Sequence, residues 1–408
     1  MMFLKKLNLF TILIAILTFS LGWQLGQRDV DLKWAGYKPT IKIENKEPPK
    51  EIKVDFKLFW STWDLVSQKY LEKSKIDPNK LFYGAISGMV AALGDPYTVF
   101  LPPEAQKATK EELNGSFSGV GIELGFNKDK QLVVIAPLEG TPADKGGIKP
   151  EDIIVKIDGK ETLNASLPDA VSKIRGPKGT EVILTIFRKG DADTKDVKLV
   201  RDTIIVKSVT VKYDNTKSGK KVAEIKLSRF GERTPAEWDS VVSDILASGA
   251  VAVVVDLRNN PGGFLDDAVY VSSEFLEGGN VVLQENYQGQ KSSFAVNRQG
   301  KLLKLPVVVL INKGSASASE IVAGALQDRK RAKLLGEKSF GKGTVQEAED
   351  LPGGAGIHIT TAKWLTPNGR WVNETEGLEP DIKVEALKTN GDEKPEDVQM
   401  KKALEILN

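Results

Sequence analysis

The chain contains no cysteine and, among its 408 residues, a single histidine, His358. The lack of cysteine excludes disulfides, thiol catalysis and cysteine-ligated zinc, and it is compatible with an extracytoplasmic location without establishing one. One imidazole cannot build a multi-histidine metal site. The function predicted below implies neither a metal nor another cofactor. A hydrolase with this composition must find its base elsewhere or use His358, for which we expect a structural or surface role.

Neither sign of charge is in excess, because the chain has 57 Lys and Arg residues against 55 Asp and Glu residues. Nucleic-acid-binding proteins usually carry a basic surplus, so we expect no nucleic acid partner. The hydrophobic fraction of 41% is ordinary for a globular protein. A chain of this length exceeds one ordinary core, and two or three domains are expected.

Only one long hydrophobic run is present, Leu7–Trp23, and it follows the basic pair Lys5-Lys6. Its length is near the lower limit for crossing a membrane, and no small-x-small cleavage site follows it, which favours an uncleaved anchor over a cleaved signal peptide. With the lysines on the cytoplasmic side, everything after Arg28 lies outside the cytoplasm. We therefore predict an extracytoplasmic protein anchored to the cell membrane, or a secreted or periplasmic one if the segment is cleaved.

Beyond this segment, the pattern of polar and apolar residues changes several times along the chain. A polar stretch is followed by apolar residues at helical spacing, then by short glycine-punctuated strands, and then by runs such as VAVVVDL and VVVLI that are typical of strands buried on both faces. Strands that alternate with helices indicate an α/β domain. The expected sections are an anchor (1–27), a linker (28–53), a helical section (54–106), a β domain (107–203), an α/β domain (204–388) and a tail helix (389–408).

A turn rich in small residues follows the buried run Val307–Ile311 and reads Ser-Ala-Ser-Ala-Ser-Glu over 315–320 before a helix begins. A serine at the start of a helix meets free N–H groups and the positive end of the helix dipole, which suits a developing oxyanion. The same letters are also typical of an N-cap with a capping-box glutamate, and taken alone they favour that simpler interpretation.

Two further segments indicate a catalytic site only when they are considered together with this serine turn. Lys342 lies between Gly341 and Gly343, and a lysine serves as a base only if burial offsets roughly 4 kcal/mol in favour of its charged form. Alone, an exposed loop lysine is the simpler interpretation, and the spacing of a phosphate-binding loop is absent. Gly262 and Gly263 follow the VAVVVDL strand, where paired glycines provide accessible amides or merely an ordinary turn.

Together these segments resemble the carboxyl-terminal processing, or tail-specific, peptidases of family S41, which use a Ser/Lys dyad. The resemblance spans about residues 54–384 and rests on four motifs in order, Leu93–Thr98, Asp256–Gly263, Ser315–Glu320 and Phe340–Gln346. It implies a multidomain α/β and β protein, with an N-terminal helical section, a PDZ-like β domain, an α/β protease core of the crotonase-like ββα type and a C-terminal tail helix.

The resemblance also implies roles for individual residues. Ser317 would be the nucleophile and Lys342 the general base, while Ser315 and Ser319 would be structural. Gln346 would position the lysine amine, and Asp328 sits where some members of the family have a supporting aspartate. The oxyanion hole would consist of the amides of Ala318 and of either Gly262 or Gly263.

The glycine-punctuated section resembles a PDZ domain, although a glycine hairpin in an unrelated β domain is the alternative. The loop Ser118–Ile122 would bind a substrate carboxyl terminus through the amides of Gly119, Val120, Gly121 and Ile122. The peptide would add beside the following strand and face a helix over Pro168–Ile174. Arg175, just after that helix, would meet a substrate carboxylate or an acid of the protease domain.

We therefore predict a serine endopeptidase that recognises exposed apolar carboxyl termini of proteins or peptides and cuts nearby. The alternatives are a non-catalytic peptide-binding scaffold and an acyl-transfer enzyme for small substrates, which would leave the PDZ-like section unexplained. Membrane contact is expected through the N-terminal segment, and a homodimer is an option that the sequence leaves open.

Overall fold

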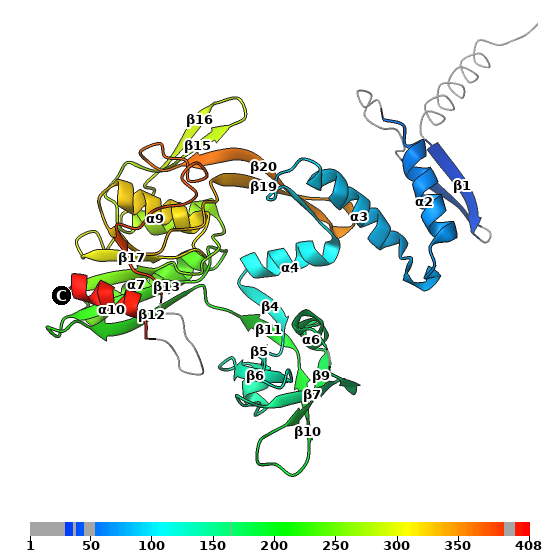
Figure 1. Ribbon diagram of the computed structural model, residues 1–408, viewed down its shortest axis with the longest axis horizontal. Coiled ribbons are helices and arrows are strands. Elements are labelled where there is room, and N and C mark those ends of the chain that lie inside the picture. The colour runs from blue at the N-terminus through cyan, green and yellow to red at the C-terminus, as the bar shows by residue number, and fades with distance from the viewer. Residues whose placement is uncertain (1–28, 36–37, 45–53, 164, 387–395) are drawn as a thin grey trace, which may run out of the picture. The chain divides into compact units, whose positions relative to one another are not determined.

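The computed structural model of the chain describes residues 29–35, 38–44, 54–163, 165–386 and 396–408, in two compact units, residues 1–81 and 82–408 (Figure 1). The hydrophobic run Leu7–Trp23, predicted to be the anchor, lies outside the described residues. Among the helices of the described residues, none has the length and apolar character needed to span a membrane.

The first described element of the first unit is a β-hairpin, where we had predicted a linker. Strands β1 (Asp29–Ala35) and β2 (Lys38–Glu44) pair antiparallel, so the prediction of a structureless linker over 28–53 was wrong for these residues. Its polar composition conceals the alternation of Val30, Leu32 and Trp34 with polar residues, a period of two that is typical of a strand.

The predicted helical section follows the hairpin. It contains α2 (Lys57–Lys69), a 3₁₀ turn (η1, Lys73–Lys75) and α3 (Pro78–Ala91), which crosses into the second unit. Asp77 accepts the N–H groups of Asn79 and Lys80 at the start of α3, as a helix-capping aspartate does. The turn after α3 leads to strand β3 (Val99–Leu101) and then to α4 (Pro103–Leu113). The β pattern predicted from Lys107 therefore begins only after Leu113.

The β domain in the second unit is a sheet in the order β10-β9-β7-β6-β5, with the short β8 (Lys160–Glu161) beside β7. Every second residue of β9 points into the core, and Val182, Leu184 and Ile186 are fully buried, which is the period expected of a half-buried strand. The helices are α5 (Pro142–Lys145) and α6 (Leu167–Ile174). The strands are β5 (Ile122–Phe126), β6 (Leu132–Pro137), β7 (Ile153–Ile157), β9 (Glu181–Phe187) and β10 (Lys195–Val200).

Two extended segments lead into and out of this domain. Strand β4 (Ser116–Gly119) pairs antiparallel with β11 (Asp202–Ile205), so the chain enters and leaves the β domain side by side. Arg201, just before β11, donates to the carbonyls of Lys173 and Ile174 at the end of α6. These bonds join the end of α6 to the segment through which the chain continues into the α/β core.

The α/β core is built on a six-stranded sheet in the order β12-β13-β14-β17-β18-β21. All neighbours from β13 to β21 are parallel, and the continuous apolar runs predicted to be buried strands are β14 and β17, every residue of which is buried. Its strands are β12 (Val209–Asn215), β13 (Lys221–Leu227), β14 (Ala252–Asp256), β17 (Val307–Ile311), β18 (Lys333–Gly336) and β21 (Ile382–Lys383).

Helices cover this sheet, and a second sheet completes the core. Helices α7 (Thr234–Ser248), α8 (Leu265–Ser273) and α9 (Ala318–Asp328) contribute to the main hydrophobic cluster. The second sheet has the order β16-β15-β20-β19, and β3 pairs with β20. Its strands are β15 (Asn280–Asn286), β16 (Lys291–Ala295), β19 (Thr344–Asp350) and β20 (Gly356–Leu365).

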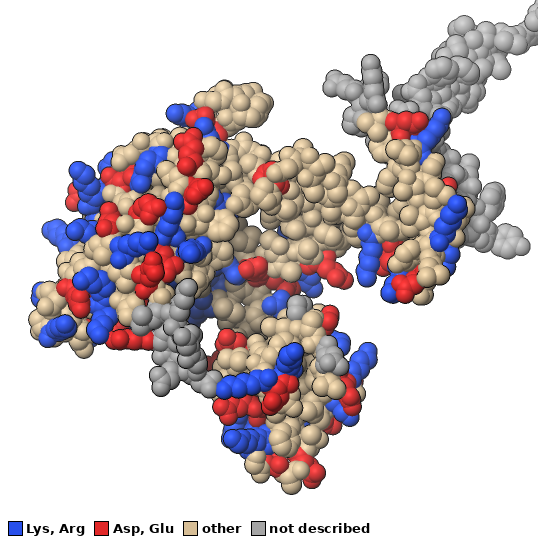
Figure 2. All heavy atoms as spheres, in the orientation of Figure 1, with Lys and Arg blue, Asp and Glu red and all other residues tan. Residues whose placement is uncertain are grey.

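The tail helix α10 (Val398–Ile406) is present, and its buried residues Met400 and Ala403 pack on the six-stranded sheet. Arg258, two residues beyond β14, donates to both carboxylate oxygens of Asp397 at 2.8 Å and holds the start of this helix against the core. On the face of the molecule that Figure 2 shows, acidic and basic side chains are interspersed, and few charged atoms lie over α3.

Candidate active site

Ser317 lies at the turn between β17 and α9, directly before the first helical residue. Its backbone has φ +55° and ψ −116°, a conformation that is strained for any residue other than glycine. Its side chain is partly exposed, whereas its neighbours on both sides are buried. The turn therefore presents one serine hydroxyl at the start of a helix.

The two flanking serines are committed to the backbone. Ser315 and Ser319 are fully buried, and their hydroxyls donate to the carbonyls of Leu257 and Asn260 at 2.8 and 2.9 Å. The N–H of Ala316 donates to Asn260 as well, at 3.0 Å. These bonds fasten the turn to the loop that follows β14. Of the three serines, only the middle one has a partly exposed hydroxyl that donates no described hydrogen bond.

The glycine pair of that loop approaches the turn closely. Gly262 has φ +102°, and a Cβ atom placed on it would lie 2.8 Å from both the Ala316 oxygen and the Ser317 Cβ. A Cβ on Gly263 would lie 1.7 Å from the Phe230 carbonyl oxygen. No side chain fits at either position. The Gly262 N–H donates to the Asn260 side chain at 2.9 Å.

The Glu320 carboxylate joins the serine turn to the lysine loop. One oxygen, Oε2, accepts the N–H of Ser317 at 2.8 Å and that of Lys342 at 2.9 Å. The other, Oε1, accepts the Gly341 N–H at 2.7 Å and the Ser339 hydroxyl. Glu320 is fully buried, and burial raises its pKa despite the four donors, which act in the opposite direction. The Glu320 carboxylate thus binds the backbones of Ser317 and Lys342, which are 25 residues apart in the sequence.

The Lys342 amine is partly buried, and burial lowers its pKa, while the charges of Asp95 and Glu320 act in the opposite direction. Its Nζ lies 5.1 Å from the centroid of the Tyr97 ring. Within the described residues, no hydrogen bond joins Nζ to Ser317. The Lys342 amine is therefore desolvated, as expected for a lysine that serves as a base. It also points to the turn that contains Tyr97, for which the sequence had suggested no role.

The predicted partner of the lysine, Gln346, has a different set of contacts. Its side-chain amide donates to the hydroxyls of Thr344 at 2.9 Å and Thr360 at 3.0 Å. No bond from Gln346 to the Lys342 amine exists among the described side chains. The glutamine therefore braces β19 against β20 at the residue where the lysine loop ends.

The supporting role predicted for Asp328 does not fit this geometry. Asp328 is the last residue of α9, whereas Ser317 precedes its first, and 11 helical steps separate them by roughly 16 Å. Its carboxylate accepts the Asn368 N–H at 2.9 Å and pairs with Arg370. Asp328 thus fixes a loop at the far end of the helix.

The single histidine lies on β20, opposite Ala348 of β19 and Val99 of β3. His358 is partly buried, and burial together with the positive charge of Lys342 lowers its pKa. It is thus within electrostatic reach of the lysine, but no described hydrogen bond connects it to Ser317 or to an acid.

The PDZ-like loop lies between β4 and the edge strand β5. Gly119 ends β4, Gly121 has φ +78°, and Ile122 begins β5, which is the edge strand of its sheet. Thr141 packs so closely on Gly121 that a Cβ there would approach it to 2.5 Å. Val120 is buried, and its carbonyl accepts the Ala143 N–H, so the loop is fixed rather than freely moving.

Arg175 does not contact an acid of the α/β core within the described residues. Its guanidinium lies 4.2 Å from the centroid of the Phe117 ring of β4. It also lies 4.0 Å from a carboxylate oxygen of Glu111 on α4. The prediction that it meets a protease-domain acid therefore lacks support here, and its contacts join the end of α6 to the segment that enters the PDZ-like domain.

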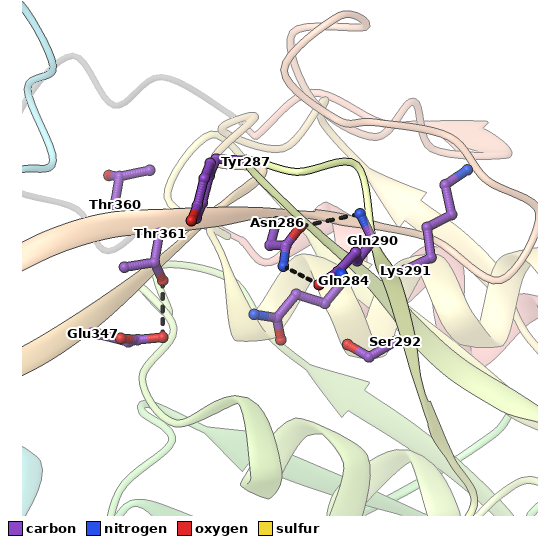
Figure 3. A pocket seen from close by; sticks show the side chains of 9 residues that line it. All are labelled: Gln284, Asn286, Tyr287, Gln290, Lys291, Ser292, Glu347, Thr360 and Thr361. Carbon is purple, nitrogen blue, oxygen red and sulfur yellow. Dashed lines mark hydrogen bonds between the residues drawn. The ribbon is translucent and has the colours of Figure 1, made fainter.

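A polar groove of about 760 Å³ lies beside β19 and β20 (Figure 3). Thr360 lines it and also accepts the bond from Gln346, so the groove borders the strand pair that carries the lysine loop. In Figure 3 the Thr361 side chain points to Glu347, and Asn286 to Gln290. The lining residues are Gln284, Asn286, Tyr287, Gln290, Lys291, Ser292, Glu347, Thr360 and Thr361.

Sequence reasoning missed the connecting role of Glu320 and the approach of Asp95 and Tyr97 to the lysine. Glu320 was interpreted as a capping-box residue, and its bond to Ser317 fits that interpretation, but its bonds to the lysine loop are tertiary. Asp95 and Tyr97 belong to the motif Leu93–Thr98, which was noted without a chemical role. Their position in a motif was the only available signal.

Three parts of the chain match known protein families. Residues 221–384 match peptidase family S41, residues 133–188 a PDZ domain, and residues 28–105 the activating protease CtpB N-terminal domain. A carboxyl-terminal-processing protease of Synechocystis is 37% identical over 370 residues, which cover 86% of each chain. The carboxy-terminal processing protease CtpA of Bacillus subtilis is 37% identical over 324 residues, 79% of this chain and 67% of that one.

Among solved structures, one assigned to the S41 proteases, from Bacteroides fragilis, aligns with a TM-score of 0.53 over 87% of this chain and 92% of its own, at 16% identity. At that identity it shows the fold alone. The predicted sections, from the helical region through the PDZ domain and the mixed α/β core to the C-terminal helix, are confirmed. The chain therefore belongs to peptidase family S41, and it is a serine-type carboxyl-terminal processing peptidase with a PDZ domain.

Proposed function

We propose that the protein is an endopeptidase that cuts substrate proteins near their carboxyl termini, with Ser317 as nucleophile and Lys342 as general base. The observation that carries this proposal is the shared acceptor, Oε2 of Glu320, which holds the backbones of both residues at 2.8 and 2.9 Å. Lys342 shares this acceptor with Ser317, whereas neither His358 nor Asp328 has a described bond to Glu320, which supports lysine as the base.

In the proposed reaction, neutral Lys342 accepts the Ser317 proton as Oγ attacks the scissile carbonyl. The peptide C–N bond then breaks, the proton passes to the leaving amine, and the same lysine activates the water that hydrolyses the acyl-enzyme. Because the amine lies over the Tyr97 ring and makes no described hydrogen bond to Ser317, we expect the lysine side chain to turn toward Ser317 for proton transfer.

The oxyanion would bind to the N–H groups of Ala318 and Gly263. As the first residue of α9, Ala318 has an N–H without a partner inside the helix. Gly262 is the weaker candidate because its N–H already donates to Asn260. The bridge between Gly263 and Phe230 uses the Gly262 carbonyl and the Phe264 N–H, and it leaves the Gly263 N–H unused.

The PDZ domain would capture the substrate tail. The edge position of β5 and the fixed loop Gly119–Ile122 support a peptide that adds as a further strand, with its terminal carboxylate on the loop amides. We keep the amides of Gly119, Val120, Gly121 and Ile122 as the binding group. For Arg175 we keep only the proposed contact with a substrate carboxylate. In this structure its guanidinium packs on the Phe117 ring.

We further propose that the chain acts outside the cytoplasm, attached to the membrane through Leu7–Trp23. The charge pattern of that segment supports this orientation. Because the chain has no cysteine, a single Lys217→Cys substitution provides a unique label site on an exposed residue. Labelling of intact cells by a membrane-impermeant maleimide is expected, and labelling only after lysis would refute the location.

The homodimer also remains a proposal, supported by large apolar side chains exposed on and just after α3, namely Phe82, Met89 and Leu93. The same part of the surface carries few charges (Figure 2). A solution mass at twice the chain mass, lost in a Met89→Glu variant, would support it.

The catalytic proposal is tested with an unstructured reporter protein that ends in apolar residues. Ser317→Ala and Lys342→Ala should each reduce cleavage by about 10³-fold or more. His358→Ala should retain it, and complete loss in that variant would overturn the dyad. A reporter with an amidated carboxyl terminus should be cleaved poorly, whereas equal cleavage would favour an acyl-transfer enzyme that ignores the substrate tail.

A further inference from the structure

The turn between α3 and β3 lies next to the catalytic lysine. In this turn the Asp95 carboxylate accepts the Tyr97 N–H at 3.0 Å through Oδ1 and the Thr98 hydroxyl at 2.7 Å through Oδ2. Gly94, with φ +74°, lies three residues beyond the end of α3 and allows the chain to reverse. The carboxylate is therefore held in a defined position although it is partly exposed.

The turn is fastened to the sheet that carries the lysine loop. Strand β3 pairs with β20, with Val99 opposite His358, and the buried Thr98 hydroxyl accepts the Thr360 N–H at 3.0 Å. The Thr360 hydroxyl in turn accepts the bond from Gln346, four residues beyond the lysine. A continuous set of contacts thus connects Asp95 to the strand pair from which Lys342 extends.

The lysine amine points toward this turn. Its Nζ lies over the Tyr97 ring at 5.1 Å, a distance typical of a cation–π contact. No carboxylate of the described residues lies within ion-pair distance of Nζ, so the nearby negative charges act without a fixed contact. Such an arrangement stabilises an ammonium without holding it in place as a direct ion pair would.

Several charged or titratable groups face the Lys342 amine. Two carboxylates favour its ammonium form, and Asp95 has a larger effect than Glu320, while burial opposes both. Burial also acts on Asp95, but hydrogen bonds from Thr360, Thr98 and the backbone outweigh it and place the Asp95 pKa below its usual value. Tyr97 has a raised pKa and stays neutral, and His358 opposes the ammonium only when protonated.

We propose that Asp95 is a positioning residue for Lys342, the counter-charge that stabilises the lysine ammonium formed when Ser317 gives up its proton. This inference rests on the proposed role of Lys342 as the base. During acylation the proton leaves the Ser317 Oγ for Nζ, and Asp95 offsets the positive charge until the leaving amine takes that proton. The helical section thereby contributes directly to the catalytic site through one turn.

Asp95→Asn tests the proposal because it removes the charge while the amide oxygen can still accept the Tyr97 N–H. Its NH₂ group replaces the oxygen that accepted the Thr98 hydroxyl, and that hydroxyl can instead accept a hydrogen bond from the NH₂ group. The neutral lysine is probed with acetic anhydride, in a Ser317→Ala background, with Lys342 acetylation measured by peptide mass spectrometry across pH. Loss of the negative charge should lower the pH at half-labelling by on the order of one unit. The acidic limb of kcat/KM, measured with Ser317 restored, should move in the same direction.

Glu349→Gln is the matched control, because Glu349 is an exposed acid on β19 with no resolved effect on the lysine. The proposal is overturned if that variant shifts the labelling as much as Asp95→Asn does. It is also overturned if Asp95→Asn lowers activity by one factor at every pH with unchanged labelling, since that pattern indicates a purely structural turn. Asp95→Ser, whose hydroxyl can cap the same turn, gives the same comparison if the Asn variant does not fold.

The labelling experiment also separates this inference from the proposed function. If the wild-type chain shows no Ser317-dependent cleavage while Asp95→Asn still shifts the labelling of Lys342, the dyad assignment fails and the electrostatic coupling stands. If cleavage depends on Ser317 and Lys342 but labelling and pH profile do not respond to Asp95, the dyad stands and the positioning role fails.

Discussion

The backbone amides of Ser317 and Lys342 donate to one and the same oxygen, Oε2 of Glu320, at 2.8 and 2.9 Å. Glu320 is fully buried, and its other oxygen accepts Gly341 and Ser339. The acid therefore fixes the spacing of the proposed nucleophile and base through their main chains, and leaves both side chains free for chemistry.

Glu320→Gln should impair both activity and stability. The glutamine oxygen can replace only one carboxylate oxygen, and its NH₂ group would face two N–H or O–H donors. Leaving buried donors unsatisfied costs about 2 kcal/mol. We expect a lower midpoint in urea unfolding together with a reduced kcat. Ser339→Ala, which removes one of the four donors, should have a smaller effect on both, and an equal or larger effect would contradict this account.

Lys342→Met should stabilise the protein at neutral pH while eliminating cleavage. Burial lowers the pKa of Lys342 in the folded state, so between the folded and unfolded pKa values the unfolded chain binds more protons and wild-type stability rises with pH. The advantage of the Met variant should therefore grow as pH falls below about 10, and then become constant below the folded pKa. Urea midpoints measured from pH 6 to 10 check this sign, and an advantage that grows with pH would refute it.

Ser317→Gly should fold to a more stable protein than Ser317→Ala, although both are inactive. The φ of +55° and ψ of −116° at this position are strained for alanine and accessible to glycine. Relief of this strain is worth about 1 kcal/mol, which exceeds the entropy that glycine loses on folding only if the strain is real. Thermal unfolding of the two variants decides, and equal stabilities would mean that the conformation is not strained.

Asp328→Asn should lower stability without changing the pH profile of cleavage. The carboxylate pairs with Arg370 and accepts the Asn368 N–H at the far end of α9. We expect a lower melting temperature, while the acidic limb of kcat/KM stays where it is in the wild type. A shifted limb would restore Asp328 to the catalytic group.

Gly121→Ala should weaken capture of carboxyl-terminal peptides. The position has φ +78°, and the new Cβ would approach Thr141 to 2.5 Å, so the loop must move. Gly140→Ala is the matched control, with φ +75° in the same domain and nothing within 4 Å of its Cβ. Fluorescence anisotropy of a labelled peptide should show a higher Kd for Gly121→Ala alone, and similar losses in both variants would indicate backbone strain only.

Local patterns predicted the elements well where one period dominated. The runs at Val251–Leu257, which is hydrophobic except for Asp256, and at Val307–Ile311 form central parallel strands, and the turn that follows the second run carries Ser317. The hairpin over Asp29–Glu44 was missed because charged or polar residues occupy most alternate positions and lower its average hydrophobicity. Helix α4 was missed because its charged sequence shows no clear apolar stripe.

The sequence by itself determined the family and the order of the domains, and it singled out Ser317 and Lys342 as the candidate dyad, because these depend on motifs in which each residue is a chain neighbour of the next. The tertiary structure alone decided that Glu320 holds both segments, that Asp95 and Tyr97 face the lysine, and that Asp328 lies at the wrong end of its helix. Those relationships join residues that are up to 247 positions apart, from Asp95 to Lys342. No local pattern encodes such distances, since only the pairing of β3 with β20 and the packing of α9 bring the groups together.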